Sequence, residues 1–251
     1  MEKLRVDAIT FDYGNTLMLD PFDRIMRLKG FDFQKIMERN GYEVSRKKLV
    51  ETWKDANLAV NQPFFSHFSQ EVPIIAEMLR RLGVSRKDVK KIAQELLVSY
   101  REGYRMVIKK DERIENVRKV LEALINRGKR LFVLSNDRTD TAESFFSWSG
   151  LGKYFEKIII SEAMGMEKPD LRIFRHMIKA TGMEKERVLY VGDEPERDVK
   201  PAKEIGIKVV MLKVPDNLSV PGWRDYNVKL DEKHRPDFVI KDLAELLEII
   251  E

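Results

Sequence analysis

The sequence contains no cysteine among its 251 residues and only three histidines. The absence of cysteine excludes disulfide bonds, thiolate nucleophiles and cysteine-based zinc or iron–sulfur sites. The histidines, His67, His176 and His234, lie far apart and do not have the spacing of metal ligands. The chemistry of this protein must therefore come from other side chains.

Long hydrophobic runs are also missing. No apolar run approaches the roughly 18–20 residues that a membrane span needs. Residues 1–11 lack the longer apolar region and the small-residue cleavage site of a secretory signal. The composition, 43% hydrophobic and 35% charged, is typical of a soluble globular protein. We therefore expect a cytoplasmic protein with no membrane partner, and its many Lys, Glu and Arg residues resemble the usage of hyperthermophiles.

The net charge is +4, with an isoelectric point near 9.0. The basic clusters at 46–48 and 86–91 fall in helix-like segments interleaved with acidic residues, which indicates solvated helix faces. We therefore expect no nucleic-acid partner. A mild positive balance suits a protein that binds small anionic substrates. No feature of the sequence indicates an oligomeric state.

Short β-branched runs are the clearest repeated feature, and we predict strands at 6–11, 131–134, 158–160, 188–191, 209–212 and 238–240. Apolar runs without alternation are typical of parallel strands covered on both faces. Amphipathic segments follow or separate them, at 114–127, 138–149, 170–182, 197–205 and 241–250. This alternation predicts an α/β fold with a doubly wound, Rossmann-like parallel sheet. The stretch 214–237, rich in Pro, Asn and charge, is predicted to be a loop.

One long gap interrupts the alternation, between the first strand and the second. It has helix periodicity at 32–40, 45–60, 71–82 and 86–105. We therefore predict an inserted α-helical cap domain at 19–109 and a core domain at 1–18 and 110–251. Such an insertion would sit above the edge where open α/β sheets bind ligands. The aromatic residues Trp53, Phe64, Phe65 and Phe68 are predicted to form part of the cap core.

Polar residues follow four of the predicted strands. They are Asp12, Ser135, Lys168 and the pair Asp193 and Asp198. A single Asp or Ser after a strand is commonly a helix cap or turn residue, and we interpret Asp170 in that way. Asn15 and Thr16 are expected to shape the turn after Asp12, whereas Asp137 and Glu194 carry no assigned role. The order of the four positions taken together indicates a site.

This order resembles the haloacid dehalogenase superfamily, whose members are mostly Mg²⁺-dependent phosphatases. Its four motifs look like Asp12 with Thr16, Ser135, Lys168, and Asp193 with Asp198. The resemblance covers about 5–18 and 110–245 and includes the runs 165–174 and 191–198. The insertion between the first two motifs is similar to the helical cap of that superfamily.

The resemblance implies a role for each motif residue. Asp12 would attack phosphorus and form an aspartyl-phosphate. Mg²⁺ would be held by Asp12, the backbone carbonyl of Gly14 and Asp193, with Asp198 supporting the metal site.

The remaining motif residues would contact a small phosphorylated substrate. Ser135 would donate a hydrogen bond to the phosphoryl oxygens, and Asn136 is expected beside it. Lys168 would neutralise the charge of those oxygens and of Asp12.

The sequence departs from the phosphatase pattern at Gly14, where the phosphatases carry a second, acid/base Asp. Ordinary alkyl phosphates should therefore be poor substrates, because general acid–base catalysis contributes on the order of 10²–10⁴-fold. Three functions stay open: a Mg²⁺-dependent phosphohydrolase, a haloacid dehalogenase- or phosphonatase-like hydrolase, and a catalytically weak phosphate- or partner-binding protein. Dehalogenases do not need the metal, so Asp193 disfavours that branch, and phosphonatases need a cap lysine that the sequence does not place.

Overall fold

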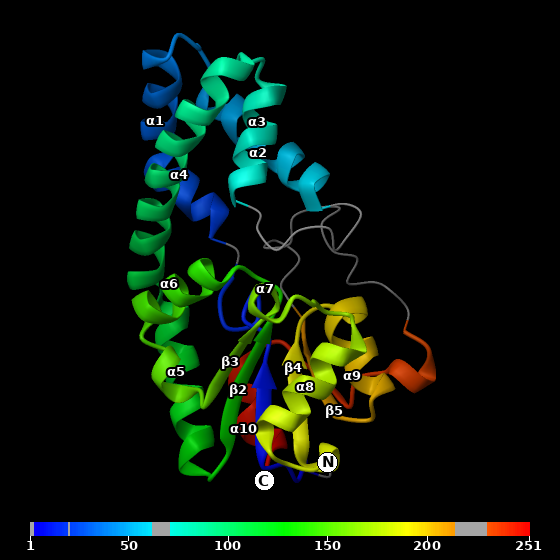
Figure 1. Cartoon of the computed structure of the whole chain (residues 1–251). Coiled ribbons are helices and arrows are strands. Elements are labelled where there is room, and N and C mark those ends of the chain that lie inside the picture. The colour runs from blue at the N-terminus through cyan, green and yellow to red at the C-terminus, as the bar shows by residue number, and fades with distance from the viewer. Residues whose placement is uncertain (1–2, 20, 62–70, 214–229) are drawn as a thin grey trace. The chain divides into compact units, whose positions relative to one another are not determined.

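The computed structural model of the chain describes residues 3–19, 21–61, 71–213 and 230–251 (Figure 1). The chain forms two compact units. The core unit comprises Met1–Asp20 and Asp111–Glu251, and the helical unit comprises Pro21–Lys110. Within the described residues, no helix is long and apolar enough to cross a membrane.

The core unit is built on one parallel sheet of six strands, in the order β3-β2-β1-β4-β5-β6. The strands are β1 (Ala8–Phe11), β2 (Arg130–Ser135), β3 (Lys157–Ile160), β4 (Val188–Gly192), β5 (Lys208–Leu212) and β6 (Phe238–Ile240). The α/β fold predicted from the unalternated apolar runs is therefore confirmed, and each predicted strand is present.

The first strand in the chain lies in the middle of the sheet. Phe11, at its end, is in register with Val133 of β2 on one side and Val191 of β4 on the other. The topological switch point of the sheet lies between β1 and β4. From β1 the sheet continues through β2 to β3, and from β4 it continues in the opposite direction through β5 to β6. Ligands of open α/β sheets bind outside the carboxyl ends of the strands at such a point.

Helices cover the sheet of the core unit. They are α5 (Glu112–Asn126), α6 (Thr139–Ser149), α7 (Ser161–Met164), α8 (Leu171–Thr181), α9 (Lys200–Glu204) and α10 (Leu246–Ile249). The apolar face of α8 packs Ile173, Phe174 and Met177 into a buried cluster with the strand residues Phe132 and Tyr190. Burial of this kind is worth roughly 1.5–3 kcal/mol for each large apolar side chain. The packing therefore holds the carboxyl end of β4 in a fixed position.

Two predicted helices of the core unit differ from expectation. The segment predicted as a helix at 197–205 begins instead with a π-helical turn at Pro195–Val199, and α9 follows it. The segment 241–250 forms a 3₁₀ turn at Leu243–Glu245 and then α10. Asp170 caps α8, as predicted, by accepting a hydrogen bond from the backbone N–H of Arg172. The predicted loop at 214–237 falls largely outside the described residues, and its end contains the 3₁₀ turn Glu232–His234.

In the helical unit, the described residues form α1 (Phe22–Arg39), α2 (Arg46–Asn61), α3 (Glu71–Arg81) and α4 (Arg86–Lys109). Helix α1 begins ten residues before the predicted start at residue 32. Gly30 obscured the apolar periodicity of this part of the helix. A β-carbon at this position would lie 2.8 Å from Nε of Arg46, so the glycine permits close packing against the Arg46 side chain.

Aromatic side chains form part of the core of the helical unit. Trp53 is buried and stacks between Phe22 and Tyr100, with ring centroids 4.8 and 5.0 Å away. Such pairs contribute about 0.5–1.5 kcal/mol beyond their buried area. The cap-core assignment of Phe64, Phe65 and Phe68 lies outside the described residues. The assignment of the helical unit as a cap stays a prediction.

Candidate active site

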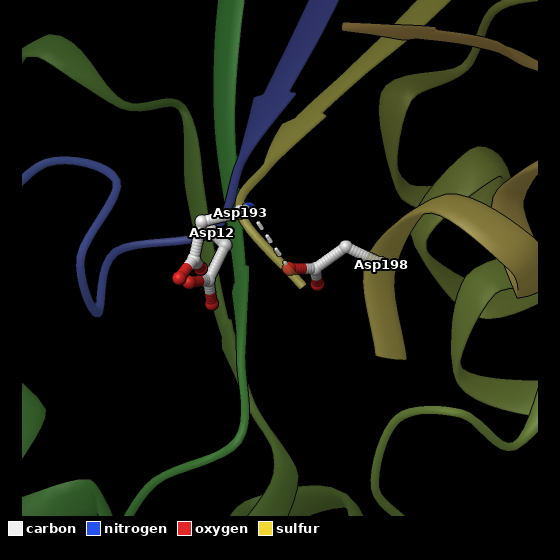
Figure 2. A group of neighbouring side chains, drawn as sticks. All are labelled: Asp12, Asp193 and Asp198. Atoms are coloured by element: carbon white, nitrogen blue, oxygen red, sulfur yellow. Dashed lines mark hydrogen bonds between the residues drawn. The ribbon is translucent and has the colours of Figure 1, made fainter. Parts of the chain in front are cut away.

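The carboxyl ends of β1 and β4 bring two aspartates together. Asp12 directly follows β1, and its backbone N–H donates to the carbonyl oxygen of Val191 at 2.8 Å. Asp193 directly follows β4, and both side chains are buried. Figure 2 shows their carboxyl groups side by side and pointing in the same direction. Residues 181 positions apart in the chain therefore share one site because their strands are neighbours.

Asp198 joins this pair from the π-helical turn that follows β4. One carboxylate oxygen from each of Asp12, Asp193 and Asp198 lies within 4.8 Å of the others. Oδ2 of Asp198 accepts a hydrogen bond from the backbone N–H of Asp193 at 3.2 Å (Figure 2) and another from that of Glu194 at 3.0 Å. The side chain of Asp198 is therefore fixed by the main chain that directly follows β4.

Lys168 supplies a buried positive charge to the cluster. Its Nζ lies 2.8 Å from Oδ1 of Asp12, 2.6 Å from Oδ1 of Asp198 and 3.1 Å from the hydroxyl oxygen of Tyr190. The Tyr190 hydroxyl in turn donates to Asp198 at 2.9 Å. Tyr190 is fully buried, and it was not predicted as a site residue because an aromatic residue inside a buried strand looks like core alone.

These contacts set the protonation of the buried groups. Burial raises the pKa of Asp12 to about 6, while the charge of Lys168 opposes that shift. Burial alone would lower the pKa of Lys168, but the carboxylates of Asp12 and Asp198 raise it above its ordinary value. The same ammonium and the surrounding hydrogen bonds overcome burial at Asp198 and lower its pKa. At neutral pH, Asp12 is thus mainly a carboxylate and Lys168 is charged.

Ser135 and Asn136, at the end of β2, have different surroundings. Ser135 is buried and lines the same cavity as Asp12. The carboxamide of Asn136 makes two hydrogen bonds to the main chain of Lys168: it donates to the carbonyl oxygen at 2.8 Å and accepts from the N–H at 2.7 Å. These bonds position the main chain of Lys168, and Asn136 also lines the cavity, so its substrate contact stays a prediction.

The candidate residues enclose a small cavity of about 50 Å³. Its lining consists of Asp12, Gly14, Ser135, Asn136, Lys168, Glu194, Arg197 and Asp198. Two of these residues, Glu194 and Arg197, received no role from the sequence. Arg197 Nε lies 3.2 Å from Oε2 of Glu194, and both side chains are largely buried.

The turn after Asp12 is tightly hydrogen-bonded. The carbonyl oxygen of Tyr13 accepts from the N–H groups of Thr16, Leu17 and Met18 at 3.0–3.3 Å. Asn15 lies in the left-handed region, with φ 54°, a conformation that asparagine tolerates better than most residues. Thr16 is fully buried. Asn15 and Thr16 therefore shape this turn, as the sequence predicts.

Gly14 occupies a position where a β-carbon would meet no close contact. A β-carbon at Gly14 would meet only Oδ2 of Asp12, at 4.0 Å, and its φ lies outside the left-handed region. Neither crowding nor backbone conformation therefore requires glycine here. The missing carboxyl group is a chemical difference, not a consequence of the fold.

Asp137 is a second feature that the sequence left without a role. The hydroxyl group of Tyr13 donates a hydrogen bond to Oδ2 of Asp137, and the N–H of Arg138 donates to Oδ1 at 2.7 Å. The Tyr13 ring stacks on Phe145, with centroids 4.9 Å apart. Burial raises the pKa of Asp137 from 3.8 to about 8, with a further contribution from the charge of Asp12. Its position after a strand gave no signal of this environment.

A parallel sheet with carboxylates, a lysine and a serine at its switch point defines a hydrolase of the Rossmann-like class. The family model of haloacid dehalogenase-like hydrolases matches residues 72–212, and the chain belongs to this family. The resemblance inferred from the four motifs is thereby confirmed.

Several curated relatives are phosphatases by name. The chain is 32% identical over 133 residues to a glyceraldehyde 3-phosphate phosphatase of Methanocaldococcus jannaschii, covering 53% of this chain and 54% of that protein. It is 31% identical over 121 residues to a phosphoserine phosphatase of Thermus thermophilus, covering 48% and 44%. The chain thus spans about half the length of these two relatives. The haloacid dehalogenase-like hydrolase domain-containing protein 3 of Bos taurus is 25% identical over 233 residues, covering 89% and 88%.

Solved structures share the fold over nearly the whole chain. The HAD hydrolase YfnB of Bacillus subtilis, bound to magnesium, superposes with a TM-score of 0.69 at 19% identity, covering 98% of this chain and 99% of that one. The L-2-haloacid dehalogenase of Xanthobacter autotrophicus superposes with a TM-score of 0.59 at 16% identity, covering 97% of each. At these identities the likeness establishes the fold alone.

Proposed function

We propose that this protein is a Mg²⁺-dependent phosphohydrolase that acts on a small phosphorylated substrate through an aspartyl-phosphate on Asp12. The observation that carries the proposal is the group of three buried carboxylates. One carboxylate oxygen from each of Asp12, Asp193 and Asp198 lies within 4.8 Å of the others. Such a group of hard oxygen donors fits a divalent cation.

The donor set also fits magnesium in kind. Mg²⁺ prefers hard oxygen ligands, is usually held by one or two carboxylates, and keeps several waters. Asp12, Asp193 and the backbone carbonyl of Gly14 would hold the ion. Asp198 would support the site by accepting hydrogen bonds from the backbone N–H groups of Asp193 and Glu194. When bound, the metal would neutralise negative charge on the phosphoryl group and thereby permit attack by an anionic carboxylate.

Asp12 would act as the nucleophile. A carboxylate oxygen of Asp12 would form a bond to phosphorus while the bond from phosphorus to the leaving oxygen breaks, and the leaving group departs with that electron pair. Water would then attack the phosphorus of the aspartyl-phosphate, which releases phosphate and regenerates the Asp12 carboxylate. Lys168 holds Oδ1 of Asp12 at 2.8 Å and so fixes the orientation of the carboxyl group. Ser135 would donate a hydrogen bond to a phosphoryl oxygen.

Gly14 sets the expected substrate range. Without a carboxyl group at this position, the leaving oxygen lacks the acid that the phosphatase pattern places there. Substrates with good leaving groups, such as aryl and acyl phosphates, should therefore be hydrolysed faster than alkyl esters.

The test is hydrolysis of p-nitrophenyl phosphate and acetyl phosphate by the purified protein, with Mg²⁺ and with EDTA, alongside Asp12→Asn. Turnover that requires the metal and vanishes in the variant supports the proposal. Equal rates in the wild type and Asp12→Asn would contradict it.

Gly14 also keeps an alternative function of the same family open, since halide and phosphonate leaving groups do not need the same acid. Under this alternative, 2-chloropropionate or phosphonoacetaldehyde would be hydrolysed and p-nitrophenyl phosphate would not. Asp193, buried beside Asp12, disfavours the metal-independent branch. Release of chloride in the presence of EDTA would establish that branch.

A further inference from the structure

The positive charge of the chain is unevenly divided between the two units. The helical unit contains 19 Lys and Arg residues but 11 Asp and Glu residues, which gives it a net charge of +8. The core unit contains 27 and 31 of these residues, which gives it a net charge of −4. The candidate catalytic residues all lie in the core unit, so the basic excess belongs to the other one. Such asymmetry between two parts of a chain indicates a polyanionic partner for the basic part.

The densest basic run of the helical unit lies where α3 ends and α4 begins. Residues 80–91 include six basic residues, all exposed, and one acidic residue. The two on α3 share Glu77, since Nε of Arg80 and Nε of Arg81 each lie 2.7 Å from a Glu77 oxygen. The other four lie at positions 86, 87, 90 and 91 of α4, where residues four apart are neighbours on the helix surface. Within its first two turns, α4 therefore exposes one basic face, which consists of Arg86, Lys87, Lys90 and Lys91.

The acidic residue of this run is held away from the basic face. Oδ2 of Asp88 accepts hydrogen bonds from the hydroxyl groups of Tyr42, at 2.9 Å, and Ser85, at 2.5 Å. Asp88 is accordingly half-buried, whereas its basic neighbours are exposed. The sequence indicated an ordinary solvated helix face here, because acidic and basic residues alternate along the chain. In the structure that alternation does not extend to the exposed face, which carries cations alone.

The energetics of α4 do not explain this arrangement. Cations in the first turn of a helix oppose its dipole, and like charges four residues apart destabilise it. Lys91 donates a hydrogen bond to Oδ1 of Asn40 at 2.8 Å. Within the part of the chain that the structure describes, Arg86, Lys87 and Lys90 form no ion pair. A charge pattern that local helix preferences disfavour is expected where the residues have a function.

The surroundings of the basic face distinguish among polyanions. No large apolar side chain of residues 80–91 is exposed. Membrane-bound helices and protein interfaces use such side chains as anchors. Single-stranded nucleic acids are bound by stacking on aromatic rings. The run contains no aromatic residue, and Tyr42 beside it is half-buried with its hydroxyl group bonded to Asp88. Lys and Arg without apolar or aromatic anchors fit the phosphate backbone of a duplex.

We propose that the basic face of α4 binds the phosphate backbone of double-stranded DNA without reading its sequence. The four cations project from one helix, and the major groove of B-form DNA admits a helix, whereas the deep, narrow groove of an RNA duplex does not. This inference does not depend on the proposed function, because none of its residues belongs to the candidate active site.

The experiment measures binding of the full chain to a fluorescent DNA duplex of mixed sequence by anisotropy, over a series of salt concentrations. Four phosphate contacts predict a slope of log Kobs against log salt between about −3 and −4, since each contributes about −0.9. The double variant Arg86→Gln with Lys90→Gln should bring this slope closer to zero by about two. Its affinity at about 0.1 M salt should fall by about 10- to 100-fold, as the loss of two contacts implies.

The matched control removes the same charge from the core unit. Arg175 and Lys179 are an exposed pair of cations four residues apart on α8. The double variant Arg175→Gln with Lys179→Gln should keep the wild-type slope and affinity. An equal loss of affinity in both double variants would overturn the inference, because it would mean that net charge alone attracts the DNA.

Three other results would also overturn it. One is no binding of the duplex by the wild type at low salt, and another is wild-type affinity in Arg86→Gln with Lys90→Gln. The third is tighter binding of single-stranded DNA, an RNA duplex or phosphatidylserine vesicles than of the DNA duplex. If the first double variant does not fold, Lys87→Gln with Lys91→Gln tests the same face by the same criteria.

Discussion

Gly192 and Asp198 approach each other so closely that no other residue fits at the end of β4. A β-carbon on Gly192 would lie 2.6 Å from both Cγ and Oδ2 of Asp198. The backbone of Gly192 is not left-handed, so the contact, rather than conformational freedom, explains the glycine. The carboxyl group of Asp198 can therefore lie against β4 and accept hydrogen bonds from the backbone N–H groups of Asp193 and Glu194, which directly follow that strand.

Replacing this glycine should disturb the site. We expect Gly192→Ala to lower the free energy of unfolding by about 1–3 kcal/mol, as overpacking of a buried position does, and to weaken Mg²⁺ binding. Thermal unfolding with and without Mg²⁺ would measure both effects. Gly182→Ala, at the left-handed end of α8, is a control in which destabilisation should leave Mg²⁺ affinity unchanged. Unchanged metal affinity in Gly192→Ala would contradict the role given to Asp198.

Gly14→Asp should increase turnover of alkyl phosphates. A β-carbon at Gly14 would meet no close contact, and the added carboxyl group would protonate the leaving oxygen. The gain in kcat is at most about 10²–10⁴-fold, the usual contribution of general acid catalysis. The isosteric control Gly14→Asn should show no such gain. Equal rates in Gly14→Asp and the wild type, with the fold and metal binding preserved, would indicate that another group already supplies the proton.

Asp137 should make the protein less stable as the pH rises. Because burial raises its pKa from 3.8 to about 8, the folded state holds a proton that the unfolded state releases between these two values. The unfolded state therefore binds fewer protons in this window, and the free energy of unfolding falls as pH increases through it. We expect the melting temperature to fall less between pH 6 and pH 8.5 in Asp137→Asn than in the wild type.

The readout for Asp137 is the slope of melting temperature against pH, since the substitution also changes the hydrogen bonds from Tyr13 and Arg138. Asp55→Asn, at an exposed position of the helical unit, should keep the wild-type slope. A wild-type slope in Asp137→Asn would show that this carboxyl group is not protonated in the folded state.

Lys168→Met should destabilise the core unit strongly. It would leave Asp12 and Asp198 buried as like charges without their shared cation. Removing one partner of a buried ion pair costs about 3–5 kcal/mol. Urea unfolding at neutral pH would measure the loss, and part of it should be recovered by adding Mg²⁺. The same loss with Lys179→Met, a lysine in the last turn of α8, would show that the effect is not specific to the site.

Mg²⁺ should stabilise the folded protein by mass action. A ligand that binds only the folded state at one hundred times its Kd adds about 2.7 kcal/mol to the free energy of unfolding. We expect a rise in melting temperature with Mg²⁺ that is absent in Asp193→Asn. A melting temperature that does not respond to Mg²⁺ in the wild type would contradict the metal assignment.

The central strands β1, β2 and β4 were predictable because they are buried on both faces. Residues such as 188–191 and 209–212 are apolar without alternation, and that pattern is typical of covered parallel strands. The start of α1 was not predictable, because Gly30 interrupts the apolar periodicity of this helix. Gly30 is explained instead by its close contact with the side chain of Arg46, which lies on another helix. Information of that kind resides in tertiary packing, which no local pattern carries.

The candidate site was predictable where each residue follows a strand, as Asp12 and Asp193 do. The roles of Tyr190 and Asp137 were not, because each depends on a partner far away in the chain. Asn136 shows the same limit: its place beside Ser135 gave no sign that its carboxamide holds the main chain of Lys168. Position along a strand indicates which residues gather, and only the folded chain shows which atoms they contact.

The central position of β1 has a consequence for how the protein folds during synthesis. This strand is made before its hydrogen-bonding partners, which are β2, beginning at residue 130, and β4, beginning at residue 188. Contacts of high sequence separation form late, so β1 stays unpaired while the intervening residues are made. Asp12 and its neighbour Asp193 therefore meet only after β4 has been made. Until then the chain carries Asp12 without the buried carboxylates that surround it in the fold.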